Sequence, residues 1–147
     1  MKNLLKKGFT LIELLIVIAI IGIMVALVLP NLAGARERAR DSRRKTDLNS
    51  IQQALRLYYN DNQTFPTTDS LAWGHALQSP TGTLYMSILP YDPSSTSSTN
   101  IEYDYVSDGK TYYLVATLEN KSDSDIEASH SRCAGPNTEL AYVVCEE

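Results

Sequence analysis

The sequence is poor in the residues from which catalytic and transition-metal sites are built. Among its 147 residues there are two histidines and two cysteines. The histidines, His75 and His130, lie in no nucleophile elbow, phosphate loop or pair of metal ligands. Zinc sites usually contain two cysteines or two histidines at short spacing, and the sequence contains no such pair. We therefore expect a protein that is not an enzyme and has no cofactor.

Basic residues are scarce over most of the chain. Residues 46–147 carry four Lys/Arg against fourteen Asp/Glu, a net charge of −10, whereas residues 1–45 carry nine against three, a net charge of +6. The two parts sum to the chain's −4. An acidic surface repels phosphates, so we expect no specific nucleic-acid partner. The acidic part, rich in Tyr, Ser and Thr, is typical of a head exposed outside the cytoplasm.

The chain lacks a long linker and an internal repeat, so it is long enough for one domain plus an appendage. The appendage is visible at residues 9–29, where only Thr10 and Glu13 are polar. As a helix this stretch would be about 31 Å long, enough to cross the hydrocarbon core of a membrane. A carboxylate at the centre of a membrane helix costs roughly 2.5–3.5 kcal/mol, so Glu13 needs an explanation.

A basic leader, residues 1–8, precedes the apolar stretch. A secretory signal has a small-residue cleavage site after its apolar core. Here the small residues at 33–35 lie inside a helical pattern, and Gly8 lies before the core instead. Cleavage at Gly8 would remove the leader and keep the apolar segment.

The helix is predicted to continue beyond the membrane, from Phe9 to about Tyr59, with Pro30 as a tolerated kink. Apolar residues recur there at spacings of 3, 4 and 3, which is one face of a helix: Leu48, Ile51, Leu55 and Tyr58. Between the two apolar stretches, residues 36–45 carry six basic and two acidic residues. We expect this part to be a solvated helical face with ion pairs, rather than a DNA-binding surface.

The remaining residues predict a small antiparallel sheet. Two Tyr- and Val-rich runs, residues 101–106 and 111–118, flank the Asp-Gly turn "SDGK", and residues 140–144 form a third strand. Residues 70–78 are expected to form a short helix, and residues 88–100 to be turn-rich. The fold class is therefore α+β, with a long N-terminal helical spine and a small C-terminal β-sheet head.

Cys133 and Cys145 are the two cysteines. An even number behind a membrane-targeting segment favours a disulfide, which would stabilise the tail by roughly 3 kcal/mol. The alternatives are two free thiols, or a zinc site with His75 or His130.

The segment "KGFTLIELLIVIAIIGI", residues 7–23, closely resembles the class III signal of type IV prepilins and pseudopilins. The match covers Gly8, Phe9, the pair Thr10-Leu11, Glu13 and the small residue Gly22, and Pro30 falls where many pilins have a helix-breaking proline. The resemblance implies cleavage after Gly8 by prepilin peptidase and N-methylation of Phe9. It also implies a role in filament assembly for Glu13 and Pro30.

The same resemblance implies how the chain is organised and where it acts. Residues 1–8 would be the leader, 9–30 the transmembrane and assembly helix, 31–60 its amphipathic continuation, and 61–147 the pilin head with its disulfide loop. The expected partners are copies of the chain in a helical filament, related minor pilins, prepilin peptidase, an inner-membrane assembly platform and, before assembly, membrane lipid. The head would lie outside the cytoplasmic membrane, and the filament would be an extracellular pilus (fimbrium) or a periplasmic pseudopilus.

The head residues favour two filament types. "YYNDNQTFPTT" and "LPYDP" are similar to the major pseudopilin of type II secretion, but Ser94-Ser95 follow where that protein usually has Trp-Gly. The cysteine pair resembles the C-terminal disulfide loop of true pilins. We therefore expect a type IV pilus subunit first. The alternatives are a major pseudopilin of type II secretion, and a membrane-tethered binding module that uses the signal only for export.

Two further expectations concern charge. "DSDI", residues 123–126, resembles the acidic calcium loop of those pseudopilins, so Asp123 and Asp125 are calcium candidates, although a solvated acidic loop is the favoured interpretation and we expect no metal. The leader has three lysines and the far side of the span has six basic residues, which by charge alone would place residues 36–45 in the cytoplasm. The motif requires the opposite orientation, and we follow the motif.

Overall fold

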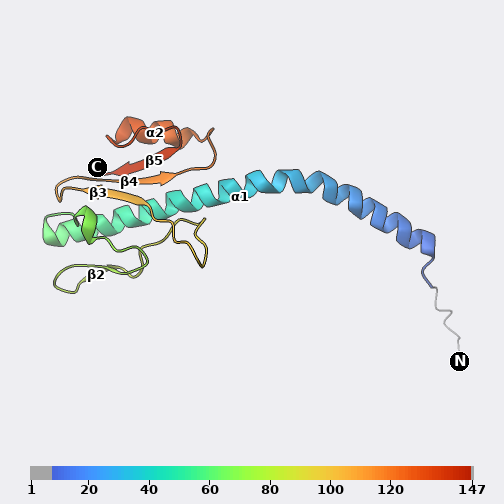
Figure 1. The fold of residues 1–147 in the computed structure, drawn as a ribbon, viewed down its shortest axis with the longest axis horizontal. Helices are drawn as coiled ribbons and strands as arrows, with labels where there is room; N and C mark the ends of the chain where they lie inside the picture. The colour runs from blue at the N-terminus through green and yellow to red at the C-terminus, as the bar shows by residue number, and fades with distance from the viewer. Residues whose placement is uncertain (1–7, 147) are drawn as a thin grey trace, which may run out of the picture. The chain divides into compact units, whose positions relative to one another are not determined.

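The computed structural model describes residues 8–146, so most of the expected leader lies outside the described residues. The chain divides into two compact units, Met1–Arg36 and Glu37–Glu147. The long helix α1 (Leu11–Asn62) begins in the first unit and continues into the second (Figure 1). It is assigned as helix through Pro30, and it starts two residues later and ends three residues later than expected.

The end of α1 is set by local hydrogen bonds. Gln63 has a positive φ of 56°, and its N–H donates to the Tyr59 carbonyl oxygen at 2.7 Å. The Asn62 side-chain amide donates to the Tyr58 carbonyl oxygen at 2.8 Å, which satisfies one of the last carbonyls of the helix. Pro66 follows shortly afterwards, where it cannot extend the helix.

The second unit contains the predicted antiparallel sheet. Its strands are β3 (Asp104–Ser107), β4 (Tyr112–Thr117) and β5 (Ala141–Cys145), in the order β3-β4-β5. The β3–β4 turn is built as the sequence predicts: Gly109 has a φ of 88°, and the Asp108 carboxylate accepts from the N–H groups of Lys110 and Thr111. The hairpin and the third strand are confirmed.

The sheet lies between α1 and a second helix, α2 (Ser124–Arg132), as Figure 1 shows. Alternate residues of β4 and β5 face opposite sides, as strand geometry requires. Leu114 and Val144 belong to the main core with the predicted α1 face, which is confirmed as buried: Leu48, Ile51, Leu55 and Tyr58. Val115 and Val143 belong to a second apolar cluster, against which Cys133 packs.

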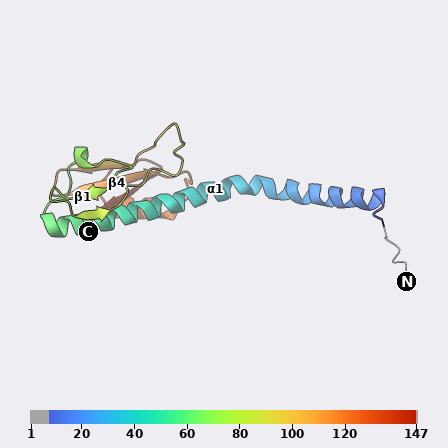
Figure 2. The same cartoon turned by 90° about the horizontal axis from the view of Figure 1, so that it is seen from below.

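The expected helix over residues 70–78 is wrong. A 3₁₀ turn, η1 (Thr68–Ser70), is followed by a small hairpin of β1 (Leu77–Gln78) and β2 (Leu84–Met86), which Figure 2 shows beside α1. Gly74 has a φ of 74°, and a Cβ there would come within 2.6 Å of the Tyr91 ring. This close tertiary contact requires a left-handed glycine and ends any helix at that point.

Helix α2 was not predicted, because only Ile126 and Ser129 of its nine residues are buried and its apolar pattern is weak. Its end is joined to the end of β5 by the Cys133–Cys145 disulfide, which confirms that expectation. The Gln52 side-chain amide donates to the Cys145 carbonyl oxygen at 2.8 Å, so α1 also holds this end of the chain.

Candidate functional site

The N-terminal end of α1 places the expected processing residues on an exposed helix start. Thr10 precedes the first helical residue, and its hydroxyl accepts from the Glu13 N–H at 3.3 Å. The same hydroxyl lies 3.5 Å from Glu13 Oε2, to which it can donate. Thr10 therefore acts as an N-cap, and it positions the Glu13 carboxylate at the positive end of the helix dipole. Gly8 and Phe9 are exposed just before it.

The helix that follows is apolar on every side. Residues Leu11–Leu29 are long and apolar enough to cross a membrane, and none of them is buried within the chain. In the bilayer roughly 28 Å of helix would match the hydrocarbon thickness. Outside lipid so much exposed hydrocarbon marks an interaction surface.

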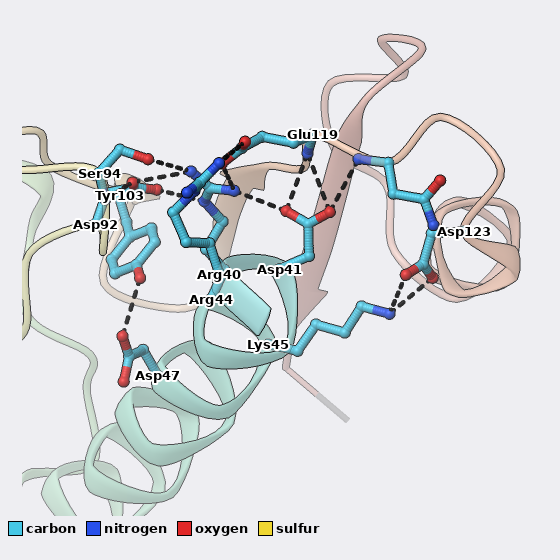
Figure 3. Close-up of polar contacts among 11 residues, drawn as sticks. Arg40, Asp41, Arg44, Lys45, Asp47, Asp92, Ser94, Tyr103, Glu119 and Asp123 are labelled. Carbon is cyan, nitrogen blue, oxygen red and sulfur yellow. Dashed lines mark hydrogen bonds and ion pairs between the residues drawn. The ribbon is translucent and has the colours of Figure 1, made fainter. Parts of the chain in front are cut away.

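Beyond the apolar span, from Arg36 onward, α1 becomes rich in charged residues. Arg44 is buried and forms three ion pairs: its Nε and Nη2 donate to Asp92 at 2.6 and 3.0 Å, and its Nη1 donates to Asp41 at 2.6 Å and to Glu119 at 2.8 Å (Figure 3). Arg44 Nη2 also donates to the Ser94 hydroxyl at 2.7 Å. Burial opposes its charge, but these partners raise the pKa of Arg44 above its ordinary value.

Asp41 completes the network from the carboxylate side. It is 2% exposed and accepts the backbone N–H groups of Glu119 and Asn120 at 2.9–3.1 Å as well as Arg44. Arg40, the residue before Asp41 in α1, pairs with both carboxylate oxygens of Glu119. We call Arg40, Asp41, Arg44, Asp92 and Glu119 the ion-pair network. It fastens α1 to the loop after Leu89 and to the segment after β4.

The expectation that residues 36–45 form a solvated face is therefore wrong at its centre. Asp41 and Arg44 are buried because they continue the core stripe of α1 at helical spacing: Arg44 lies four residues before Leu48, and Asp41 lies three residues before Arg44. Sequence reasoning missed them because charged residues are seldom fully buried unless paired, and their partners lie about 50 to 80 residues away. The position of both residues on the buried face of α1 was the one sequence feature that could have predicted their burial.

A second buried carboxylate of α1 lies six residues after Asp41. Asp47 is 5% exposed, accepts from the Tyr103 hydroxyl at 3.0 Å and pairs with Arg43 at 3.0 Å. Burial raises the pKa of Asp47. Burial and the nearby charge of Asp47 both raise the pKa of Tyr103. The Tyr103 hydroxyl therefore stays protonated and donates to this carboxylate.

The ion-pair network predicts that the head loses stability in acid. Hydrogen bonds from Arg40 lower the pKa of Glu119 from its ordinary 4.5 to about 2. Burial opposes the ionisation of Asp92, but hydrogen bonds from Arg44 still lower the pKa of Asp92. Carboxylates with lowered folded pKa values stabilise the fold above their ordinary pKa, and this stability is lost as the pH falls through the folded pKa. The free energy of unfolding should therefore fall between pH 4.5 and about 2.

Denaturant unfolding of the full chain in detergent, followed by the single Trp73 at a series of pH values, measures this effect. Asp47 acts in the opposite direction, because its raised pKa makes its protonation on acidification favourable for the fold, and it offsets part of the loss. The Glu119→Gln variant is the control and should show a shallower pH dependence. A wild-type unfolding free energy that stays constant through this window would contradict the network's role.

The two calcium candidates are engaged by a lysine. Lys45 Nζ donates to both oxygens of Asp123 and to Asp125 Oδ2, each at 2.7 Å. Burial opposes the ionisation of Asp123, but Lys45 and the Asp125 N–H lower its pKa. Within residues 8–146, no group of three His, Cys, Asp or Glu side chains could hold a metal ion. The two histidines, like the acidic pair, belong to no metal cluster in this range.

Comparisons with known proteins give a match to the N-terminal segment and matches to longer parts of the chain. Residues 4–29 match the family model described as the prokaryotic N-terminal methylation motif. The type II secretion system core protein G of Klebsiella pneumoniae is 38% identical over 97 residues, which cover 60% of this chain and 69% of that protein. The chain belongs to the type IV pilin and type II secretion pseudopilin family.

Two further relatives show the breadth of this pilin and pseudopilin family. Core protein G of Vibrio cholerae is 43% identical, over 47% of this chain and about half (48%) of that protein's length. The type IV wide pilus major component of Thermus thermophilus is 39% identical, over 60% of this chain and 68% of that protein. No solved structure matches the chain. Pilins and pseudopilins are structural proteins, so the expectation of a non-enzyme is confirmed.

Proposed function

We propose that the chain is a filament subunit of the major-pseudopilin type, which builds a type II secretion pseudopilus. The observation that carries the proposal is its likeness to core protein G from several bacteria. The residues alone predict a pilus subunit first and a pseudopilin second, because Trp-Gly is missing after Pro93. The comparisons support the pseudopilin better than the pilus.

The methylation motif at residues 4–29 supports the processing steps that we propose. The precursor is inserted through residues Leu11–Leu29, cleaved after Gly8 by prepilin peptidase and N-methylated at Phe9. Cleavage creates an amine four residues before Glu13, which is one helical turn. A protonated amine and a carboxylate attract strongly in hydrocarbon, so Glu13 gains a partner, in its own chain or in a neighbouring subunit. Thr10 holds the carboxylate at the helix end until then.

The ion pairs support an orientation with the head outside the cytoplasm. Of the six basic residues that follow the span, three pair with carboxylates far along the head: Arg40, Arg44 and Lys45. A fourth, Arg43, pairs with the buried Asp47. These basic residues are paired within the folded head, so they are located with the head. They should therefore not be counted as a signal that keeps residues 36–45 in the cytoplasm. The filament then grows from the cytoplasmic membrane into the periplasm.

The second candidate is a type IV pilus subunit. The Thermus thermophilus relative and the Cys133–Cys145 disulfide favour it. Both candidates share the inserted precursor, the cleavage site and the helical packing of subunits. They differ in what the filament does once it is built.

Deletion of the coding gene in the native host separates the two. The proposal predicts that secreted enzymes accumulate in the periplasm of the mutant, that surface pili remain, and that the plasmid-borne gene restores secretion. Normal secretion with loss of surface pili would overturn it in favour of the pilus. If neither changed, the filament role itself would be contradicted.

A further inference from the structure

The contact between Lys45 and the start of α2 is a complete cation site whose cation is part of the chain. The ammonium of Lys45 has three hydrogens to donate and meets three carboxylate oxygens at 2.7 Å, two from Asp123 and one from Asp125. The Lys45 and Asp123 side chains are 19% and 17% exposed. The ammonium also lies 5.7 Å from the centre of the Tyr142 ring, which adds a cation–π attraction.

The contact holds a helix in place. Asp123 is the N-cap of α2 and accepts from the Asp125 N–H at 3.0 Å, so the same carboxylate both starts α2 and binds Lys45 of α1. Lys45 thereby fixes the start of α2 to α1 on the side where Figure 3 shows the ion-pair network. Without a cation at this point, two carboxylates would face each other across a partly buried gap.

A divalent cation does not fit these residues. Calcium takes six to eight oxygen ligands at about 2.3–2.6 Å, and magnesium requires octahedral geometry. The described residues offer two carboxylates here and no third acidic side chain in the group. The ammonium already occupies the centre between them, and a divalent ion at the same place would be repelled by it.

We propose that the Lys45 ammonium is the permanent counter-ion of the Asp123–Asp125 segment, so that the head folds without calcium. The inference goes beyond the proposed function, because it concerns the folded head and holds for a pilus or a pseudopilus alike. It also disagrees with the resemblance of residues 123–126 to a calcium loop. Chelators should therefore leave this subunit folded.

The wild-type chain tests the proposal without any variant. Thermal unfolding of the full chain in detergent is followed by near-UV circular dichroism, in millimolar calcium chloride and in EDTA, with sodium chloride keeping the ionic strength equal. A ligand that binds only the folded state raises the unfolding midpoint, so the midpoints should agree within about 1 °C. A midpoint several degrees higher in calcium than in EDTA would overturn the proposal.

A charge-removing variant tests the role of Lys45 itself. Lys45→Met keeps the apolar stem and removes the ammonium, and it should lower the unfolding midpoint by several degrees. Lys121→Met is the matched control, because it makes the same change in net charge at an exposed ion pair with Glu139 and should lower the midpoint by less than about 2 °C. Equal effects of the two substitutions would show that Lys45 is no special counter-ion.

Discussion

Replacing Arg44 with methionine is expected to destabilise the head by about 3–5 kcal/mol, the usual cost of removing one partner from a buried ion pair. The Arg44→Met variant keeps most of the apolar volume but leaves Asp41 and Asp92 buried without their cation. Glu119 would keep Arg40, which is the other arginine of the network. The loss should therefore come mainly from the two buried carboxylates.

Denaturant unfolding of the full chain in detergent, followed by Trp73 fluorescence, measures the difference, because the single tryptophan is 9% exposed and lies in the main core. Arg132→Met is the matched control. Arg132 is exposed and its Nε donates to the Ala128 carbonyl oxygen at 3.2 Å, so its loss should cost less than about 1 kcal/mol. If both variants lost the same stability, the network would be an ordinary set of surface ion pairs.

Replacing Glu13 with alanine is expected to reduce filament assembly strongly while insertion and cleavage continue. Removing one partner of a charge pair buried between subunits typically costs about 2–5 kcal/mol, and each 1.4 kcal/mol is a tenfold change in affinity. Repeated along a filament, this loss should reduce the yield of sheared filaments by more than about tenfold. The membrane fraction should still contain the cleaved subunit.

One further variant tests whether the charge of Glu13 or its hydrogen bond with Thr10 matters, and a second variant is a control. Glu13→Gln keeps a side chain that can reach Thr10 but carries no charge, and we expect it to fail as alanine does. Glu37→Ala removes an exposed carboxylate from the same helix beyond the span and should assemble normally. Wild-type filament yields from Glu13→Ala would contradict the assembly role.

Much of the fold was predictable because its signals are local. The apolar run, the 3-4-3 spacing of Leu48 to Tyr58 and the Asp108-Gly109 turn each have a short-range cause that survives in the structure. The break at Gly74, before the hairpin of β1 and β2, was not predictable, because Gly74 packs closely against Tyr91, which lies 17 residues further along the chain. Helix α2 depends on Lys45 and on the buried Ile126 in a segment that is otherwise polar.

The candidate site divides in the same way. Gly8, Phe9 and Glu13 were found from a contiguous motif, and the structure adds only that Thr10 caps the helix at Glu13. The ion-pair network was missed, because a charged helix segment is predicted to be solvated unless its distant partners are known. Asp92 and Glu119 come from different loops, and no short-range pattern links them to Arg44.

Intact mass spectrometry of sheared filaments from the native host decides whether the chain is a processed filament subunit. We expect a subunit that begins at N-methylated Phe9, lacks residues 1–8 and has Cys133 and Cys145 joined. Filaments that lack the chain, or a chain that keeps its leader in the membrane fraction, would contradict this expectation.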